Sequence, residues 1–572
     1  MNLKYKINIE KPETHYLSVT ITGARNKTDD KLSFFIPSWS PGSYLMREYG
    51  KNIRNFKALN AVGEYYQFMQ TDKGVYEVDF KNSLLNGDNS QFEISYDVFC
   101  HELTVRTSHI DLSHAFIHGP SVFMGIVGVD LVEPSVEINF PPLWSKISTG
   151  LRDISIKPEV FIYSASNYDD LIDSPIEIGC QETDGFRVAG IDHELSWYGS
   201  TMPHDHDLKK DIKTIVETIS DTMGDIPYEK YTFMTHFAPG LFGGLEHKNS
   251  TALQYSSTSM VDRKGYIDWL ELVAHEYFHT WNVKRIRPLE LGPFDYLSEA
   301  MTRMHWLTEG LTSFMDQLFV HRAGLCTQEE YLERMKVNLN RYFSIPGRKF
   351  HSLEDSSFNS WIKLYRPDEN SNNSTISYYL KGGLVFFVLN ILLKRNDSCI
   401  NDLLSLLWKR YLENPAVGMI DSEVYKMIDS LAGEKVKDEF AHMIRSTEEI
   451  DFEKYLKVMG VKVEYTEESK PWIGITPRYD AENVKIKNVI LDSPAHKFGL
   501  NAEDEIIAIE GMRIHKGNFS EHEKFLKINT TYTFTVSRLG YIVTVPVLIE
   551  KAPRIIKSLK SLNESLTESF LK

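Results

Sequence analysis

The chain has 572 residues, more than one hydrophobic core usually supports, so we expect about three domains. Hydrophobic residues make up 42% and charged residues 25% of the sequence, which excludes the apolar-poor composition of disordered chains. The formal net charge of -16 argues against a nucleic-acid partner, because phosphate binding requires an excess of lysine and arginine.

The N-terminal segment lacks the apolar core and the cleavage site of a secretory signal. The longest apolar run, residues 382–393, is too short to span a bilayer, so we expect no membrane association. The four cysteines are widely spaced and form no C-x-x-C pair: Cys100, Cys180, Cys326 and Cys399. These features predict a cytoplasmic protein in a reducing compartment.

The N-terminal part of the chain has the alternating pattern of β-strands. Leu3, Tyr5, Ile7 and Ile9 alternate with polar residues, and the same pattern returns further along, so one face of each strand can be buried. We therefore predict a β-sandwich-like domain over residues 1–165. Prolines and a glycine in residues 36–44 break strand pairing and predict an ordered loop between strands.

The middle of the chain changes to a helical period. Ile212, Ile215, Val216 and Ile219 recur at helix spacing, and helical patterns dominate as far as about residue 456. We predict a mostly α-helical domain over residues 166–458. Short β-like runs then predict a separate small domain over residues 461–550, and residues 551–572 form either a docked helix or a frayed tail. The fold class is thus multidomain α+β.

The segment His275-Glu276-Tyr277-Phe278-His279 carries the chemistry. Two histidines four residues apart lie on one face of a helix, where both imidazoles can bind a single ion. Apolar flanking residues supply the helical background. The pattern predicts one catalytic Zn²⁺ per chain. Glu276 stands between the histidines without binding the ion, which suits a general base.

A catalytic zinc needs a third protein ligand and an open position. We predict Glu309, because apolar residues at helical spacing around it fix its direction. Glu299 and His305 are the alternatives, each expected instead to be a solvated or hydrogen-bonded helix residue. Lys284 and Arg285 follow the motif, where they either hold the site, bind acidic residues or lie at a solvated helix end, and we expect the last of these.

Longer stretches resemble one known family, the glycyl aminopeptidase family of zinc metallopeptidases, which are relatives of aminopeptidase N with an appended PDZ domain. The resemblance rests on residues 275–288, on residues 37–47, and on residues 306–310 around the glutamate ligand. It covers nearly the whole chain. It implies an N-terminal β domain, a thermolysin-like catalytic domain and a C-terminal PDZ domain.

The resemblance also implies roles for further residues. Gly243 and Gly244 are similar to glycines that let a strand approach the substrate backbone, and Glu246 to the glutamate that binds a free α-ammonium. Tyr379 is similar to the tyrosine that donates a hydrogen bond to the oxyanion, with the adjacent Tyr378 as the alternative.

The C-terminal segment is similar to the carboxylate-binding loop of PDZ domains. Ile473, Gly474 and Ile475 lie in that loop, and PDZ grooves bind extended peptides by adding a strand to the sheet edge. The expected partner is therefore a peptide C-terminus. A module that packs without binding a peptide is the other possibility.

These features predict a zinc aminopeptidase acting on peptides with a free N-terminus. The family implies a preference for small residues such as glycine or alanine. Two other hypotheses remain: an endopeptidase, which would not need Glu246, and a peptide-binding adaptor with an incidental peptidase core. The sequence does not indicate the oligomeric state.

Overall fold

The computed structural model describes the chain except residues 27, 82–89, 158, 202–205 and 467–469. The chain divides into two compact units. The first comprises Met1–Met301, Arg322–Leu325 and Leu404–Ile420, and the second Thr302–His321, Cys326–Leu403 and Asp421–Lys572. The boundaries of the predicted domains stay predictions.

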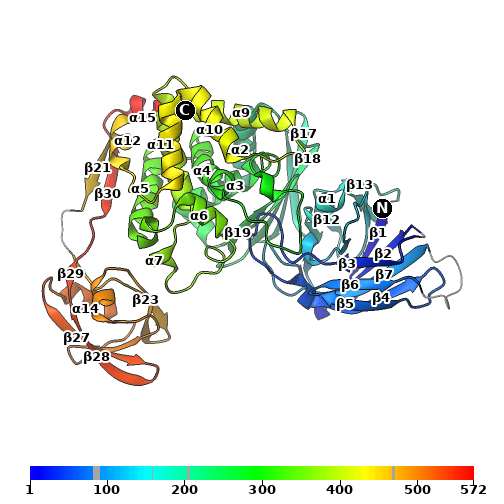
Figure 1. The fold of residues 1–572 in the computed structure, drawn as a ribbon, viewed down its shortest axis with the longest axis horizontal. Helices are drawn as coiled ribbons and strands as arrows, with labels where there is room; N and C mark the ends of the chain where they lie inside the picture. Colours follow the sequence, from blue (N-terminus) through cyan, green and yellow to red (C-terminus); the bar gives the residue numbers. More distant parts are fainter. Residues whose placement is uncertain (27, 82–89, 158, 202–205, 467–469) are drawn as a thin grey trace. The chain divides into compact units, whose positions relative to one another are not determined.

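Three sheets form the N-terminal part of the first unit, drawn in blue and cyan in Figure 1. The largest has the order β13 (Arg152–Asp153), β14 (Phe161–Ser164), β11 (Ser135–Asn139), β1 (Leu3–Asn8), β2 (Tyr16–Ala24), β7 (Gln91–Phe99) and β4 (Ile53–Asn60). The second has the order β10 (Gly125–Ile126), β3 (Lys31–Phe35), β6 (Val75–Asp79) and β5 (Gln67–Asp72). The third has the order β12 (Lys146–Thr149), β15 (Ile176–Gly179), β9 (His114–Ile117) and β8 (His109–Ile110).

The alternation read from the sequence produces this core. Leu3, Tyr5 and Ile7 of β1 are all buried while their neighbours are exposed or partly exposed. The N-terminal β-rich domain is therefore confirmed. The loop of residues 36–44 is ordered as predicted, and Trp39 at its centre is fully buried and donates to the Asp295 carbonyl at 2.9 Å.

A further sheet in the first unit mixes parallel and antiparallel strands. Its order is β16 (Glu182–Val188), β17 (Ile191–Gly199), β18 (Lys230–Phe237), β20 (Ser250–Tyr255) and β19 (Phe242–Glu246). The three central strands are parallel, and β19 pairs antiparallel with β20 at one end of the order. The helices of this unit are α1 (Tyr168–Ile172), α2 (Leu208–Met223) and α3 (Arg263–Phe278).

Helices dominate the first part of the second unit. They are α4 (Leu311–Arg322), α5 (Gln328–Ser344), α6 (Leu353–Phe358), α7 (Ser371–Ser374), α8 (Tyr378–Lys394), α10 (Asp421–Ala432), α11 (Glu434–Arg445) and α12 (Phe452–Val458), and α9 (Ile400–Glu413) runs across the boundary of the units. The stretch Ser371–Lys394 is long and apolar enough to cross a membrane, but 83% of its most apolar window is buried inside the protein. It is thus the core helix of this unit.

The C-terminal strands form a small module with a core of its own. Its main sheet has the order β23 (Ile475–Asp480), β24 (Asn483–Val489), β25 (Glu505–Ile509), β27 (Thr531–Arg538) and β28 (Tyr541–Leu548), with β26 (Met512–Arg513) beside β25. Its helices are α13 (Pro494–Phe498) and α14 (Phe519–Phe525).

Two strand pairs join this module to the rest of the unit. β21 (Val461–Tyr465) pairs with β30 (Ile556–Ser561), and β22 (Pro471–Trp472) pairs with β29 (Glu550–Lys551). The chain then ends in α15 (Glu564–Leu571), where Asn390 of α8 donates to the Phe570 carbonyl at 2.8 Å. Residues 551–572 thus contain the strand β30, which was not predicted, as well as the docked helix α15, and the module lies between the paired strands β21 and β30.

Candidate active site

Helix α3 positions the three functional residues of the H-E-x-x-H segment, which are His275, Glu276 and His279. The Asp262 side chain caps the helix by accepting from the Gly265 amide at 2.7 Å, and α3 ends at Phe278, directly before His279. His279 keeps a helical conformation. Glu276 and His279 are 5% and 1% exposed, so both functional side chains lie in a nearly dry environment.

The two histidine rings lie next to each other, with centroids 4.6 Å apart and planes at 87°. The Nδ1 of His279 is 2.5 Å from the Asn282 carbonyl oxygen. Because a carbonyl only accepts, Nδ1 carries the proton and Nε2 keeps its lone pair, which is the tautomer that a metal ligand requires.

Two glutamates lie beside His279. Glu246, Glu276 and His279 each offer a ligand atom, and these atoms lie within 4.8 Å of one another. Glu246 comes from β19 and is 4% exposed. Its Oε1 is buried and has no hydrogen-bond partner among the residues that the structure describes. A buried carboxylate oxygen without a donor is suited to a cationic ligand.

Two glycines leave the space that the Glu276 and Glu246 carboxylates occupy. A Cβ at Gly244 would lie 2.0 Å from Glu276 Oε1, and a Cβ at Gly42 would lie 2.5 Å from Glu246 Oε1. Gly42 also has a φ of +83°, which favours glycine. The Gly42 contact was not predicted, because residues 37–47 were interpreted only as a β-domain signature. The proline- and glycine-rich composition of this loop was the one signal that the sequence offered.

Strand β19 presents Gly243 and Gly244 at the end of the sheet. Gly243 pairs with Gln254 and Gly244 with Leu253 of β20. Arg106 donates to the Gly244 carbonyl at 3.1 Å. An edge strand with small residues lets an extended peptide approach its backbone.

Glu309 belongs to the second unit. It lies in a π-helical turn, Trp306–Gly310, just before α4, and is 2% exposed. A Cβ at Gly310 would lie 2.9 Å from the Gly382 Cα, so this turn packs directly against the backbone of α8. π-Turns are frequent at functional sites. His275 and His279 belong to the first unit, and the three-ligand set stays a prediction.

The start of α8 brings Tyr379 close to Glu309. Burial and the Glu309 charge raise the pKa of Tyr379 well above its usual value, and its hydroxyl is 3.5 Å from that of Tyr365. The alternative, Tyr378, is fully buried and stacks on His305 with ring centroids 5.0 Å apart. As a whole residue Tyr379 is partly exposed, whereas Tyr378 is buried.

The two alternative third ligands differ in environment. Glu299 is exposed, as expected of a solvated residue. His305 is fully buried, and its Nδ1 lies 3.2 Å from the Thr308 hydroxyl. Burial lowers the pKa of His305 to about 4, against a smaller opposite effect of Glu309.

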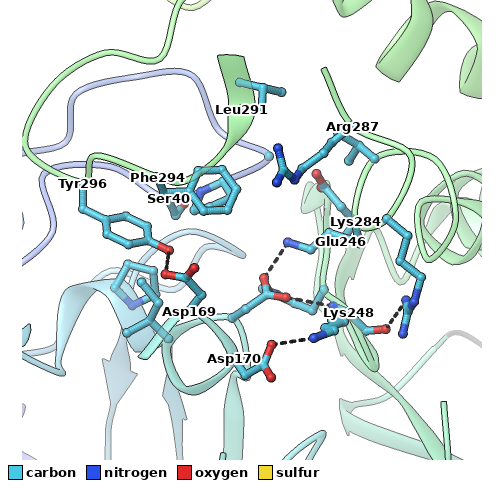
Figure 2. A pocket seen from close by; sticks show the side chains of 18 of the residues that line it. Ser40, Asp169, Asp170, Glu246, Lys248, Lys284, Arg287, Leu291, Phe294 and Tyr296 are labelled. Carbon is cyan, nitrogen blue, oxygen red and sulfur yellow. Dashed lines mark hydrogen bonds and ion pairs between the residues drawn. The ribbon is translucent and has the colours of Figure 1, made fainter. Parts of the chain in front are cut away.

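A cavity of about 320 Å³ adjoins Glu246 in the first unit (Figure 2). Lys284 donates to Asp173 at 2.7 Å within its lining, and His247 lies 3.1 Å from the same carboxylate. Burial raises the pKa of Asp173, but the charge of Lys284 and the hydrogen bond from His247 outweigh it and hold that pKa well below its usual range. The carboxylate therefore stays ionised beside Lys284.

The expectation of a solvated helix end at Lys284 and Arg285 is wrong. The Lys284 side chain is 9% exposed, and Arg285 is 7% exposed and donates to the carbonyls of Thr280, Lys248 and Pro227. Their partners are distant in sequence, which is why local patterns did not show the burial. These cations hold the chain after α3 in position.

The C-terminal module places the three predicted loop residues directly after β22. Gly474 has a φ of +82°, and a Cβ there would lie 2.0 Å from the Ser493 Cβ. Its carbonyl accepts from the Ile490 amide at 2.9 Å and from the Ser493 hydroxyl at 3.2 Å. Ile473 is in the module core, and Ile475 opens β23, the first strand in the sheet order. Only glycine fits this turn.

Two family models match the chain. Residues 4–180 match the Peptidase M61 N-terminal domain, and residues 268–385 match the M61 glycyl aminopeptidase model. Comparison with curated proteins gives no match.

Comparison with solved structures gives further matches. An aminopeptidase N family protein from Idiomarina loihiensis is 26% identical, with a TM-score of 0.92 and 100% of both chains covered. A mutant M1 zinc metallopeptidase from Deinococcus radiodurans, bound to a Tyr-Ser-Ala substrate, is 12% identical with a TM-score of 0.51, over 79% of this chain and 94% of that chain. The second likeness concerns the fold alone.

Proposed function

We propose that this chain, whose residues 4–180 and 268–385 match models of the M61 glycyl aminopeptidase family, is a zinc-dependent aminopeptidase that removes small N-terminal residues such as glycine or alanine from peptides. The observation that carries this proposal is the grouping of Glu246, Glu276 and His279 within 4.8 Å beside the edge strand β19. It combines a carboxylate for an ammonium group, a carboxylate for a proton, and a metal ligand.

The proposed zinc ligands are His275, His279 and Glu309. Two imidazoles and one carboxylate form the donor set of catalytic zinc in many peptidases, and the proton on His279 Nδ1 leaves Nε2 for the metal. The buried Glu309 supplies the negative charge. When bound, zinc polarises the carbonyl that is attacked and makes water more acidic.

Four residues of the chain then act on the substrate. Glu246 binds the α-ammonium through its unpartnered oxygen, and the Gly243-Gly244 edge receives the peptide backbone. Glu276 takes a proton from the attacking water and gives it to the leaving amine. Tyr379 donates to the oxyanion, and its high pKa keeps the hydroxyl protonated as a donor must be.

The remaining features of the proposal concern location and partners. We propose a cytoplasmic enzyme, in line with the four free cysteines. We also propose that the C-terminal module is a PDZ domain whose loop of Ile473, Gly474 and Ile475 binds peptide C-termini. Its glycine turn and edge strand support this assignment.

Metal analysis and peptide hydrolysis test the function together. His275→Ala should lose the catalytic zinc and the activity, because a ligand supplies the binding energy for the metal. The enzyme should cleave alanyl and glycyl amides and spare their N-acetylated forms. Equal cleavage of both forms would make the protein an endopeptidase, and no cleavage with no bound metal would favour a peptide-binding adaptor.

A further inference from the structure

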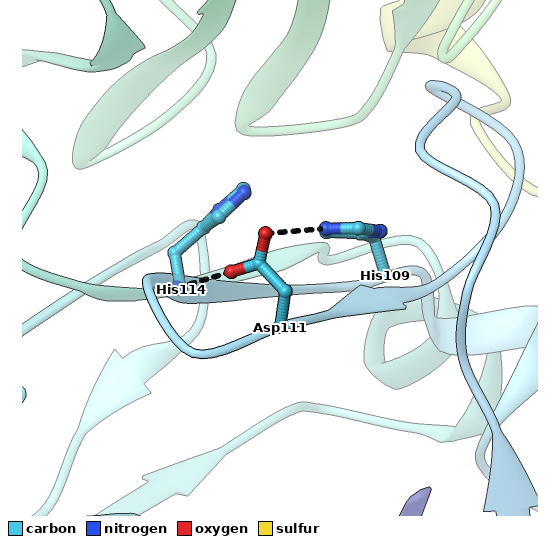
Figure 3. A group of neighbouring side chains, drawn as sticks. All are labelled: His109, Asp111 and His114. Carbon is cyan, nitrogen blue, oxygen red and sulfur yellow. Dashed lines mark hydrogen bonds and ion pairs between the residues drawn. The ribbon is translucent and has the colours of Figure 1, made fainter. Parts of the chain in front are cut away.

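A second group of metal-ligand side chains lies on the hairpin of β8 and β9. His109 opens β8, His114 opens β9, and Asp111 lies in the turn between them. Figure 3 shows the histidine rings on either side of the Asp111 carboxylate. Each residue offers one ligand atom, and the three atoms lie within 4.8 Å of one another. None of these residues belongs to the H-E-x-x-H segment or has a role in the proposed catalysis.

His109 has the tautomer of a metal ligand. Its Nδ1 lies 2.7 Å from the His101 carbonyl oxygen, which only accepts, so Nδ1 carries the proton. Its Nε2 lies 3.4 Å from Asp111 Oδ2. In neutral His109 both atoms present lone pairs to each other, so a metal ion bound by both atoms or a proton on Nε2 stabilises this arrangement.

His114 is oriented in the same way by a carboxylate. Its Nδ1 lies 2.7 Å from Glu177 Oε1, and the other Glu177 oxygen lies 2.9 Å from His236 Nε2. Burial raises the pKa of Glu177, but His236 and His114 outweigh it and lower that pKa, so the carboxylate is ionised and accepts from Nδ1. The His114 ring also stacks on Tyr198, with centroids 3.6 Å apart. With Nδ1 directed at Glu177, Nε2 is the ring nitrogen of His114 that remains for an ion.

Asp111 is fixed with one oxygen available. Its Oδ1 accepts from the amides of Ser113 at 2.7 Å and His114 at 3.1 Å, and from the Ser113 hydroxyl. Burial raises the pKa of Asp111, but the hydrogen bonds from Ser113 and His114 lower it to about 2, so the group is ionised at neutral pH. Its Oδ2 faces His109. Every member of the group is therefore held by a hydrogen bond on its far side, as metal ligands are.

We propose that His109, Asp111 and His114 bind a divalent transition metal, with Zn²⁺ as the preferred ion. Two imidazole nitrogens and one carboxylate oxygen suit zinc, and the 3.4 Å between His109 Nε2 and Asp111 Oδ2 is close to the edge of a tetrahedron with bonds of about 2.1 Å. The Asp111 side chain is 39% exposed, which leaves a path for the ion and room for water. The ion fastens the β8–β9 hairpin.

The neighbouring group of His114, Glu177 and His236 has a different role. Its ligand atoms also lie within 4.8 Å, but both Glu177 oxygens already accept from imidazoles, and all three residues are buried. It lacks an entry path and orients His114 for the outer group. A protonated His109 paired with Asp111 is the alternative that needs no metal.

Counting zinc in the full chain separates these possibilities. After chelation and re-addition of zinc, the unmodified chain should hold about two ions, one from this site and one from the proposed catalytic site. Asp111→Asn and His109→Gln should each hold about one, and His275→Ala about one. The matched control His101→Gln should keep both ions, because only the His101 carbonyl contacts His109.

A second measurement isolates the hairpin site from catalysis. In the His275→Ala background, Co²⁺ should give a visible absorption band and zinc should raise the thermal midpoint, and adding Asp111→Asn should abolish both effects. An unmodified chain with one ion that only His275→Ala removes would overturn the hairpin site and leave the proposed function intact. An unmodified chain with one ion that only Asp111→Asn removes would instead support the hairpin site and overturn the proposed function. An Asp111→Asn chain that keeps both ions would identify the His109–Asp111 contact as an ion pair.

Discussion

Glu246→Gln gives the sharpest prediction about how the substrate is recognised. The substitution keeps the size of the side chain and removes its charge. Glu246 is 4% exposed, and its Oε1 lacks a hydrogen-bond partner among the described residues, so the substrate ammonium would be its main ionic partner. Loss of one member of such a buried pair costs about 2–5 kcal/mol, which corresponds to a fall in kcat/KM of roughly 30- to 5000-fold.

The assay compares alanyl amides with a free and with an acetylated N-terminus, in the unmodified enzyme and in Glu246→Gln. Acetylation removes the ammonium, so either change alone breaks the same pair. The two losses should therefore not add. Zinc content should stay unchanged, and Glu217→Gln, at an exposed ion pair of the same unit, should behave like the unmodified enzyme. Near-normal turnover of free amides by Glu246→Gln would refute the reasoning.

Four further predictions follow from the same site and fold. Glu276→Gln should keep zinc but lower kcat at least about 100-fold, because the proposed general base acts on the attacking water and does not bind the metal. Metal analysis and steady-state kinetics of the same variant check this. Gly244→Ala should also lower kcat with zinc retained, since its Cβ would displace the Glu276 carboxylate, whereas the Cβ of Gly243→Ala would make only ordinary contacts, at 3.6 Å from Val105, and should have a smaller effect. Lys284→Met leaves the buried Asp173 without its cation and should cost about 3–5 kcal/mol of stability in denaturant unfolding, while Lys6→Met at an exposed pair should change little. Replacement of residues 471–551 by a short linker should keep hydrolysis of small amides, but removal of all residues from 461 onward should unfold the second unit, because α15 packs on α8.

The parts of the fold that depend on local patterns could be predicted from the sequence. β1 follows from alternation, and α3 from apolar spacing around His275, because strands and helices bury one face at a fixed period. The β-like runs after residue 461 correspond to strands that share a core of their own. The sequence left open whether the last helix docks or frays, since its docking depends on an amide of Asn390 far away in the chain.

The site was predictable where a motif concentrates the chemistry and unpredictable where distant segments meet. His275, Glu276 and His279 are adjacent in sequence, so their chemistry is visible there. The contact of Gly42 with Glu246 joins the N-terminal loop to a strand far along the chain. The pairing of Asp173 with Lys284 and His247 is equally non-local, so the sequence around Lys284 shows only the charges typical of a solvated helix end.

The distance between the Glu246 and Glu276 carboxylates also bears on how many residues the proposed enzyme removes from a peptide in one step. Their carboxylates lie within 4.8 Å of each other. In one amino-acid residue the amine nitrogen and the carbonyl carbon are about 2.5 Å apart, and one more residue adds about 3.8 Å to that distance. With the ammonium on Glu246 and the attacking water beside Glu276, the first carbonyl lies within reach of that water and the second does not. The geometry therefore fits release of single amino acids, because a dipeptide would carry its scissile bond past the base.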